Sequence, residues 1–129
     1  MGKKEIYSDQ YLNKILNDNK TIASVGVSLN TIRPSYFVSR YLSRRGYAII
    51  PVNPAYAGQI VWGNLACSQL SEITQDIDMV QIFRKSEAVP KIVEDAIKYL
   101  PNLKTIWMQI GVIHTDAAKT AREHGLEVI

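Results

Sequence analysis

The residues with the clearest chemical potential lie between the first two apolar segments of the chain. Gly26 can form a tight turn, and the Ser28 hydroxyl can donate a hydrogen bond to a phosphate. Arg33 carries a guanidinium that can pair with two phosphate oxygens. A helix predicted to begin at Ser35 would direct its first N–H groups and its positive dipole end to the same place. This spacing predicts a phosphate-binding turn; the alternative is an ordinary strand-to-helix turn with a solvated arginine.

The same region lacks two features that are typical of NAD sites. Of the glycines in the dinucleotide-binding pattern only the first is present, because Ser28 and Thr31 stand at the later positions. The second apolar segment ends at Asn53-Pro54, where NAD sites usually carry an acid for the ribose hydroxyls. The absence of this acid is compatible with a phosphate on the adenosine ribose. Asn53-Pro54 is explained equally well as a simple turn.

Two later apolar segments also end in polar residues. Phe83 is followed by Arg84 and a lysine ahead of a predicted helix start, which favours an anion there. Arg84 could instead pair with Glu87 as a structural ion pair. Further along, Gln109 and Gly111 place an amide and a flexible residue after an apolar segment.

The sequence holds no pattern typical of a catalytic or metal site. His114 and His124 have no sequence-local acid that suggests a triad, so we interpret both as structural. The single cysteine, Cys67, excludes an intrachain disulfide and is interpreted as a buried small hydrophobic residue. We expect no metal and no catalytic residue, and binding without catalysis is favoured over an enzyme.

Apolar β-rich segments alternate with helical segments along the whole chain. The expected strands are 21–27, 48–52, a weak 60–67, 79–83, 105–109 and 126–129. The expected helices are 9–19, 35–45 capped by Ser35, 86–100, and 115–124 capped by Thr115. This alternation predicts a Rossmann-like three-layer α/β/α fold with a mainly parallel sheet of five to six strands. A ligand would lie beyond the carboxyl ends of the strands, where the strand order reverses.

The bulk composition limits the functions that are plausible. A chain of 129 residues is expected to form one domain, residues 1–129, with a helical N-terminal extension over 1–20. The net charge of +3 has no dense basic run, which gives little reason to expect nucleic-acid binding. No segment reaches the roughly 20 apolar residues of a membrane span, and the N-terminus lacks the apolar core of a signal peptide. We therefore expect a cytoplasmic protein.

Four segments are more specific together than the turn at Gly26. They are Arg-Pro-Ser-Tyr at 33–36, Pro-Val-Asn-Pro at 51–54, Phe-Arg-Lys-Ser-Glu at 83–87 and Trp-Met-Gln-Ile-Gly at 107–111. With them, residues 21–129 resemble the small stand-alone CoA-binding domain proteins, relatives of the CoA-binding domain in the α subunit of succinyl-CoA synthetase. The resemblance implies noncovalent binding of coenzyme A or an acyl-CoA in the crevice at the carboxyl ends of the strands.

The resemblance also implies a role for ten residues. Those expected near the phosphates are Gly26, Ser28, Arg33 and Ser35; those near the adenosine end are Asn53 and Pro54; those lining the rest of the cleft are Phe83, Arg84, Gln109 and Gly111. A second cation, Arg84 or Arg40, is expected to meet the 3′-phosphate. The chain lacks the second domain that carries the phosphorylated histidine of the synthetase, so synthetase activity is not expected.

Two other functions fit the expected fold. An NAD(P)-binding redox enzyme or sensor would share it, although Asn53 and the missing glycines argue against this. A protein-interaction module with a vestigial nucleotide cleft is the third hypothesis, and a homodimer or a partner enzyme subunit is left open. Fold alone does not decide among the three.

Overall fold

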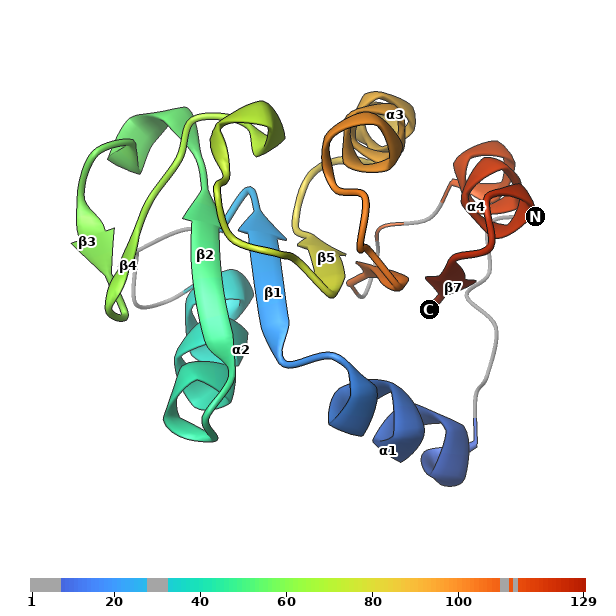
Figure 1. Ribbon diagram of the computed structural model, residues 1–129, viewed down its shortest axis with the longest axis horizontal. Helices are drawn as coiled ribbons and strands as arrows, with labels where there is room; N and C mark the ends of the chain where they lie inside the picture. The colour runs from blue at the N-terminus through green and yellow to red at the C-terminus, as the bar shows by residue number, and fades with distance from the viewer. Residues whose placement is uncertain (1–7, 28–32, 110–111, 113) are drawn as a thin grey trace.

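The computed structural model describes residues 8–27, 33–109, 112 and 114–129. Its centre is a five-stranded parallel sheet with the strand order β2-β1-β5-β6-β7 (Figure 1). The strands are β1 (Thr21–Val25), β2 (Ala48–Val52), β5 (Met79–Ile82), β6 (Thr105–Met108) and β7 (Glu127–Val128). The α-helices are α1 (Asp9–Asp18), α2 (Pro34–Arg44), α3 (Val89–Tyr99) and α4 (Thr115–Glu123); the 3₁₀ helices are η1 (Pro54–Tyr56), η2 (Leu70–Glu72) and η3 (Ser86–Ala88). The Rossmann-like α/β class is confirmed.

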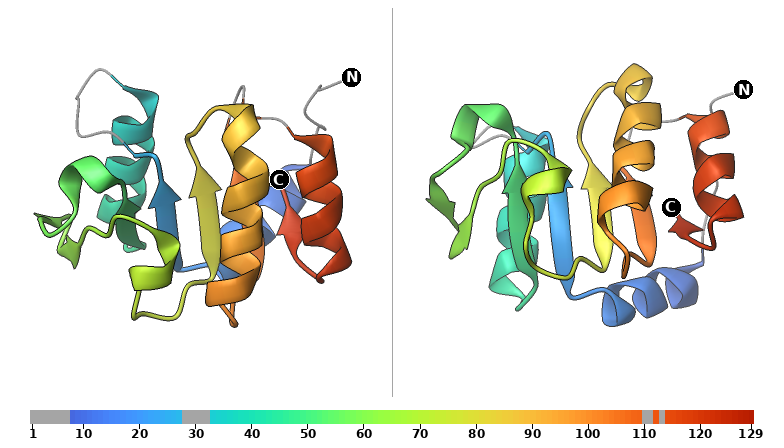
Figure 2. Two further views of the ribbon diagram at one scale, coloured as in Figure 1. Left: turned by 90° about the horizontal axis from the view of Figure 1, so that it is seen from above. Right: turned by 45° about the horizontal axis from the view of Figure 1, so that its top comes forward.

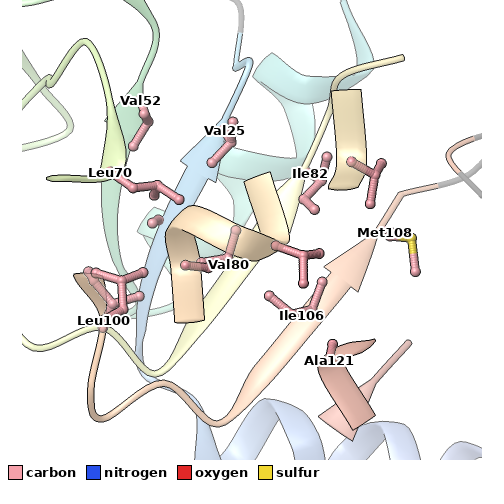
Figure 3. Packing of buried hydrophobic residues seen from close by; sticks show 14 of the residues in the cluster. Val25, Val52, Leu70, Val80, Ile82, Leu100, Ile106, Met108 and Ala121 are labelled. Atoms are coloured by element: carbon pink, nitrogen blue, oxygen red, sulfur yellow. The ribbon is translucent and has the colours of Figure 1, made fainter. Parts of the chain in front are cut away.

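Two hydrophobic cores lie on opposite faces of the sheet. Successive strand residues alternate between them: Ile22 packs in the core with Ile15 of α1 and Leu42 of α2, whereas Ala23 packs in the core of α3 and α4. Figure 2 shows α2 on one side of the sheet and α3 on the other. Figure 3 shows the larger core, where Val80 and Ile106 meet the α3 side. Because both faces are covered, the central strands read as continuous apolar runs rather than as alternating ones.

Pro51 lies inside β2 without breaking its pairing to β1. β2 is the edge strand of the sheet, and Pro51 stands opposite Ser24 in the parallel register. The Pro51 carbonyl accepts a hydrogen bond from the Cys67 N–H at 2.9 Å, on the side away from β1. The proline nitrogen faces the same outer side, so the absent donor costs no bond within the sheet.

The weak strand expected over 60–67 is not part of the main sheet. This segment instead forms a separate antiparallel hairpin of β3 (Ile60–Val61) and β4 (Asn64–Leu65). The reason is the turn at Trp62-Gly63, where both residues have positive φ, 49° and 82°. Two successive left-handed residues make a tight turn that reverses the chain.

Two expected helix caps are wrong by one or two residues. Arg33 is the N-cap of α2, Pro34 is its first residue, and Ser35 is buried inside the first turn. A proline holds the residue before it in an extended conformation, which fixes the helix start at Pro34. At α4 the cap is His114 rather than Thr115, and its Nδ1 accepts the Ala117 N–H at 3.2 Å.

Candidate functional site

The strand order reverses between β1 and β5. From β1 the chain passes through α2 to β2 on one side, and from β5 it passes through α3 to β6 on the other. The carboxyl ends of β1 and β5 therefore diverge into loops on opposite sides and leave a crevice between them. The predicted site residues lie in the loops and helix starts that follow β1, β2, β5 and β6, so the topology brings them to one edge.

Gly26 and the side chain of Arg84 lie against each other at this edge. Gly26 has φ of 81°, and its N–H donates to the Val52 carbonyl at 2.9 Å. A Cβ at Gly26 would lie 2.6 Å from Cδ and 2.9 Å from Cγ of Arg84, and real Cβ atoms do not approach so closely. The predicted tight turn is confirmed, and the glycine has a second role. It lets the stem of Arg84 lie across the turn.

A cavity of about 300 Å³ opens beside this contact, on the α3 side of the sheet. Its apolar lining is Val25, Val52, Leu70, Ala88 and Ile92, and its other lining residues are Gly26, Asn53, Pro54, Ser68, Gln69, Arg84, Lys91 and Asp95. Figure 3 shows Val25, Val52 and Leu70 at the corresponding end of the core. Four predicted residues line this cavity together: Gly26, Asn53, Pro54 and Arg84.

Asn53 holds two loops of the cavity wall in place. Its Nδ2 donates to the Val27 carbonyl at 2.9 Å, and its Oδ1 accepts the Ala55 N–H at 3.0 Å. The Asn53 N–H donates to the Cys67 carbonyl at 2.8 Å. The amide therefore ties the segment after β1 to the turn after β2, in agreement with the structural interpretation of Asn53-Pro54.

Lys91 and Asp95 are cavity residues that the sequence reasoning missed. They stand four residues apart on α3, and Lys91 Nζ lies 3.1 Å from Asp95 Oδ1. The hydrogen bond to Asp95, and then the charge of that carboxylate, raise the pKa of the Lys91 ammonium, so it stays protonated at the rim. An acid–base pair at this spacing on the helix that follows the Arg84 loop was the available signal.

A buried polar chain ties Gln109 to the sheet. The Gln81 side chain is 1% exposed, and its Nε2 donates to Ser24 Oγ at 3.1 Å and to Ser39 Oγ at 3.4 Å. Its Oε1 accepts from Gln109 Nε2 at 3.2 Å. Ser24 and Ser39 in turn share a hydrogen bond of 3.2 Å. The chain joins β1, α2, β5 and the end of β6, and it holds the Gln109 amide at the carboxyl edge.

The comparisons with known proteins identify the family. Residues 20–129 match the family model described as CoA binding domain. The chain belongs to this family. The match covers most of the chain and confirms the resemblance noted from the four sequence segments.

Known proteins and solved structures are similar to the chain over most of its length. The uncharacterized protein YneT of Bacillus subtilis (strain 168) is 36% identical over 118 residues, covering 92% of this chain and 84% of YneT. The structure of cell-free ID.343 from Thermus thermophilus has a TM-score of 0.87 at 30% identity and covers 95% of this chain and 90% of that one. An acetyl-coenzyme A synthetase of Ca. Korarchaeum cryptofilum has a TM-score of 0.72 at 21% identity, covering 88% of this chain and 26% of that one, and shows the fold alone.

The other predicted site residues that the structure describes do not line the cavity. Arg33 is exposed at the start of α2, and Phe83 is half-buried directly after β5. Ser28 and Gly111 lie outside the described residues. Arg40, the alternative cation for a 3′-phosphate, lines a groove along α2 away from the cavity.

Several structural roles account for other candidate groups. His114 caps α4, as described, and His124 Nδ1 lies 2.9 Å from the Thr120 carbonyl at the end of the same helix. Burial, and then the charge of Glu72, raise the pKa of the Cys67 thiol. Within the described ranges no ion pair joins Arg84 to Glu87.

The described residues form neither a metal-ligating cluster nor a membrane-spanning helix. Over the residues that the structure describes, no group of three or more His, Cys, Asp or Glu side chains could hold a metal ion. In the same residues no helix has the length and apolar character that crossing a membrane requires.

Proposed function

We propose that the chain binds coenzyme A or an acyl-CoA noncovalently at the carboxyl edge of the sheet, without catalysis of its own. The observation that carries this proposal is the contact of Arg84 with the Gly26 turn beside an apolar cavity, at the point where the strand order reverses. Membership of the CoA-binding domain family supports a CoA-related role.

The phosphates are assigned to two cationic positions. The diphosphate would lie near Gly26, Ser28 and the start of α2, where the helix dipole and the exposed Arg33 favour an anion. The 3′-phosphate would meet Arg84. Of the two cations considered for it, Arg84 lines the cavity, whereas Arg40 lines the outer groove of α2.

The adenosine end would occupy the cavity beside Asn53 and Pro54. A volume of about 300 Å³ is at the lower end of the range for small-molecule sites, which suits one part of an extended cofactor rather than all of it. Apolar Leu70 and Ile92 would cover a flat ring, and Arg84 and Lys91 would remain at the polar rim. Gln109, held by Gln81, would contact the remainder of the ligand along the edge.

The rival NAD(P) function has less support at Asn53. An acid at this position would accept hydrogen bonds from both ribose hydroxyls. Here Asn53 Oδ1 already accepts from the Ala55 N–H, and Nδ2 already donates to the Val27 carbonyl. Asn53 has no carboxylate to accept from the ribose hydroxyls, and both polar groups of its amide already form hydrogen bonds within the protein.

Substitution of the two cations tests the proposal. Arg33→Ala and Arg84→Gln should each weaken CoA binding by about 1–3 kcal/mol, the usual scale for a hydrogen bond to a charged group. Lys119→Gln on the exposed face of α4 removes a charge far from the cavity and should leave the dissociation constant unchanged. Isothermal calorimetry measures all three. An unchanged dissociation constant for Arg33→Ala or Arg84→Gln would remove that residue from the site.

A further inference from the structure

Charge is distributed unevenly along the chain. Residues 19–71 contain no Asp or Glu, and all twelve acids lie outside this segment. Its cations are Lys20, Arg33, Arg40, Arg44 and Arg45, which give it a net charge of +5. The rest of the chain has ten cations and twelve acids, a net charge of −2. One part of the molecule is therefore basic although the whole chain is only weakly so.

Exposed apolar side chains gather in the same segment. Among the described residues, the large hydrophobic side chains that are exposed are Phe37 (56%), Tyr41 (57%), Ile60 (68%), Leu65 (50%) and Tyr99 (42%). The first four belong to α2 and to the β3–β4 hairpin. On α2 the apolar side chains of Val38 and Leu42 are partly buried, whereas Tyr41 faces outward.

Ring contacts join α2 to the hairpin. The ring centroids of Tyr36 and Trp62 are 6.0 Å apart, and Tyr36 meets Phe37 edge-on at the same distance. Ile60 and Leu65 are paired across the hairpin and both are exposed. Figure 2 shows the hairpin beside α2 at the end of the sheet formed by β2. We call this surface the α2–hairpin face. Its exposed residues are Phe37, Tyr41, Arg44, Ile60 and Leu65, and the partly buried Arg40 lies among them.

The α2 part of this face has a groove, and the Tyr41 side chain is already held in place there before any partner binds. A shallow groove of about 480 Å³ runs along the helix between Phe37, Arg40, Tyr41 and Arg44. Arg45 donates from Nε and Nη2 to the Tyr41 hydroxyl, at 3.1 and 2.8 Å, and its guanidinium lies 5.1 Å from the ring centroid. A side chain held in this way loses less conformational entropy when a partner covers it.

We propose that the α2–hairpin face docks an acidic protein segment that carries apolar side chains. Guanidinium groups such as those of Arg40 and Arg44 match carboxylates in a two-bond fork. Exposed aromatic and arginine side chains at the centre of a surface are the composition of interface hot spots. A second copy of this chain is a poorer occupant, because a two-fold contact would bring Arg40 and Arg44 against their own copies.

This docking surface does not depend on the proposed CoA site. The groove and the cavity share no lining residue. A CoA titration and a docking measurement can therefore fail separately.

The test uses the full chain and a random copolymer of glutamate and tyrosine as the acidic, apolar probe. Calorimetry at low salt should show saturable binding to the wild type. The double variant Phe37→Ser/Arg44→Gln should weaken it by about tenfold or more, the scale of losing two hot-spot side chains. The matched control is Lys98→Gln/Tyr99→Ser, because Lys98 Nζ lies 5.1 Å from the exposed Tyr99 ring on α3. This control should bind as the wild type does.

Several outcomes would overturn the proposal. These are no saturable binding by the wild type, an equal loss in the control, and equal affinity for polyglutamate without tyrosine. Tighter binding of phosphatidylglycerol vesicles or duplex DNA through the same residues would assign the face to another class of partner. A dimer in sedimentation that Phe37→Ser dissociates would assign it to a second copy. Circular dichroism checks that each variant is folded. If the double variant unfolds, the single variant Arg44→Gln replaces it in the binding measurement.

Discussion

Gly26 and Arg84 depend on each other at the carboxyl edge. Gly26→Ala would place a methyl group within 3 Å of two Arg84 side-chain carbons, at a φ of 81°. We expect a loss of about 1–2 kcal/mol of stability from the left-handed backbone, together with weaker CoA binding because Arg84 must move. Urea unfolding and calorimetry measure the two effects.

Gly58→Ala is the matched control for that substitution. Gly58 has φ of 89°, and an added Cβ there would meet nothing within 4 Å. It should lose similar stability and keep its affinity for CoA. If Gly26→Ala bound CoA as tightly as Gly58→Ala does, the position of Arg84 across the turn would have no part in binding.

Cys67 should be a slow nucleophile in the native protein. Burial raises the pKa of its thiol, so at any pH below that raised value less thiolate is present than in an ordinary cysteine. Alkylation by iodoacetamide at pH 8, followed by mass spectrometry, should be slow in buffer and fast in denaturant. Rapid modification of the folded protein would show that the segment from β4 to η2 opens readily.

The positions of some site residues can be predicted from the sequence and those of others cannot, for physical reasons. Gly26 and Arg84 stand next to strands whose apolar runs are unmistakable, so their place at the edge could be predicted. Lys91 and Asp95 belong to a helix, and only the docked rotation of that helix decides which of its residues face the cavity. Asn53 illustrates a third case, because its position was predicted but its engagement within the loop depends on the Val27 carbonyl.

At the scale of elements, Gln81 links four parts of the fold through one buried side chain. Gln81→Leu would remove the donors to Ser24 and Ser39 and leave Gln109 without its partner. We expect a loss of about 1–3 kcal/mol in the free energy of unfolding, the usual cost of buried groups left unsatisfied. A shift of the urea midpoint measures it, and Gln75→Leu, at an exposed position, is the control. An unchanged midpoint would mean that the polar chain contributes nothing to stability.

Element types were more predictable than element boundaries. Among the described residues, apolar runs such as 79–82 and helical periodicity located the strands of the main sheet and the α-helices. The errors arose where local chemistry overrides propensity. Pro34 fixes the start of α2, the His114 ring replaces a hydroxyl as a cap, and two left-handed residues at Trp62-Gly63 fold a single expected strand into a hairpin. Ser39 and Ser24 gave no signal, because a hydrophobic pattern does not reveal which buried polar groups will meet.

For the whole molecule, strand order and charge separate the two regions to which we assign the proposed binding of CoA and of a protein partner. The order β2-β1-β5-β6-β7 puts the crevice between β1 and β5. Arg84 lines the cavity beside it, and Arg33 is exposed at the start of α2. The basic α2–hairpin face lies beside this edge, on the opposite side of the sheet from α3. A ligand at the crevice and a protein on α2 could thus be bound at the same time.

The most direct test of the CoA-binding proposal is a calorimetric titration of the purified protein with CoA, with dephospho-CoA, NAD and ADP run in parallel. We predict saturable binding of CoA that weakens when the 3′-phosphate is absent, and no comparable binding of NAD. Binding of NAD in place of CoA would contradict the proposal and favour a redox function. No heat and no thermal shift with any of the four would also contradict it, and would leave protein interaction as the function to pursue.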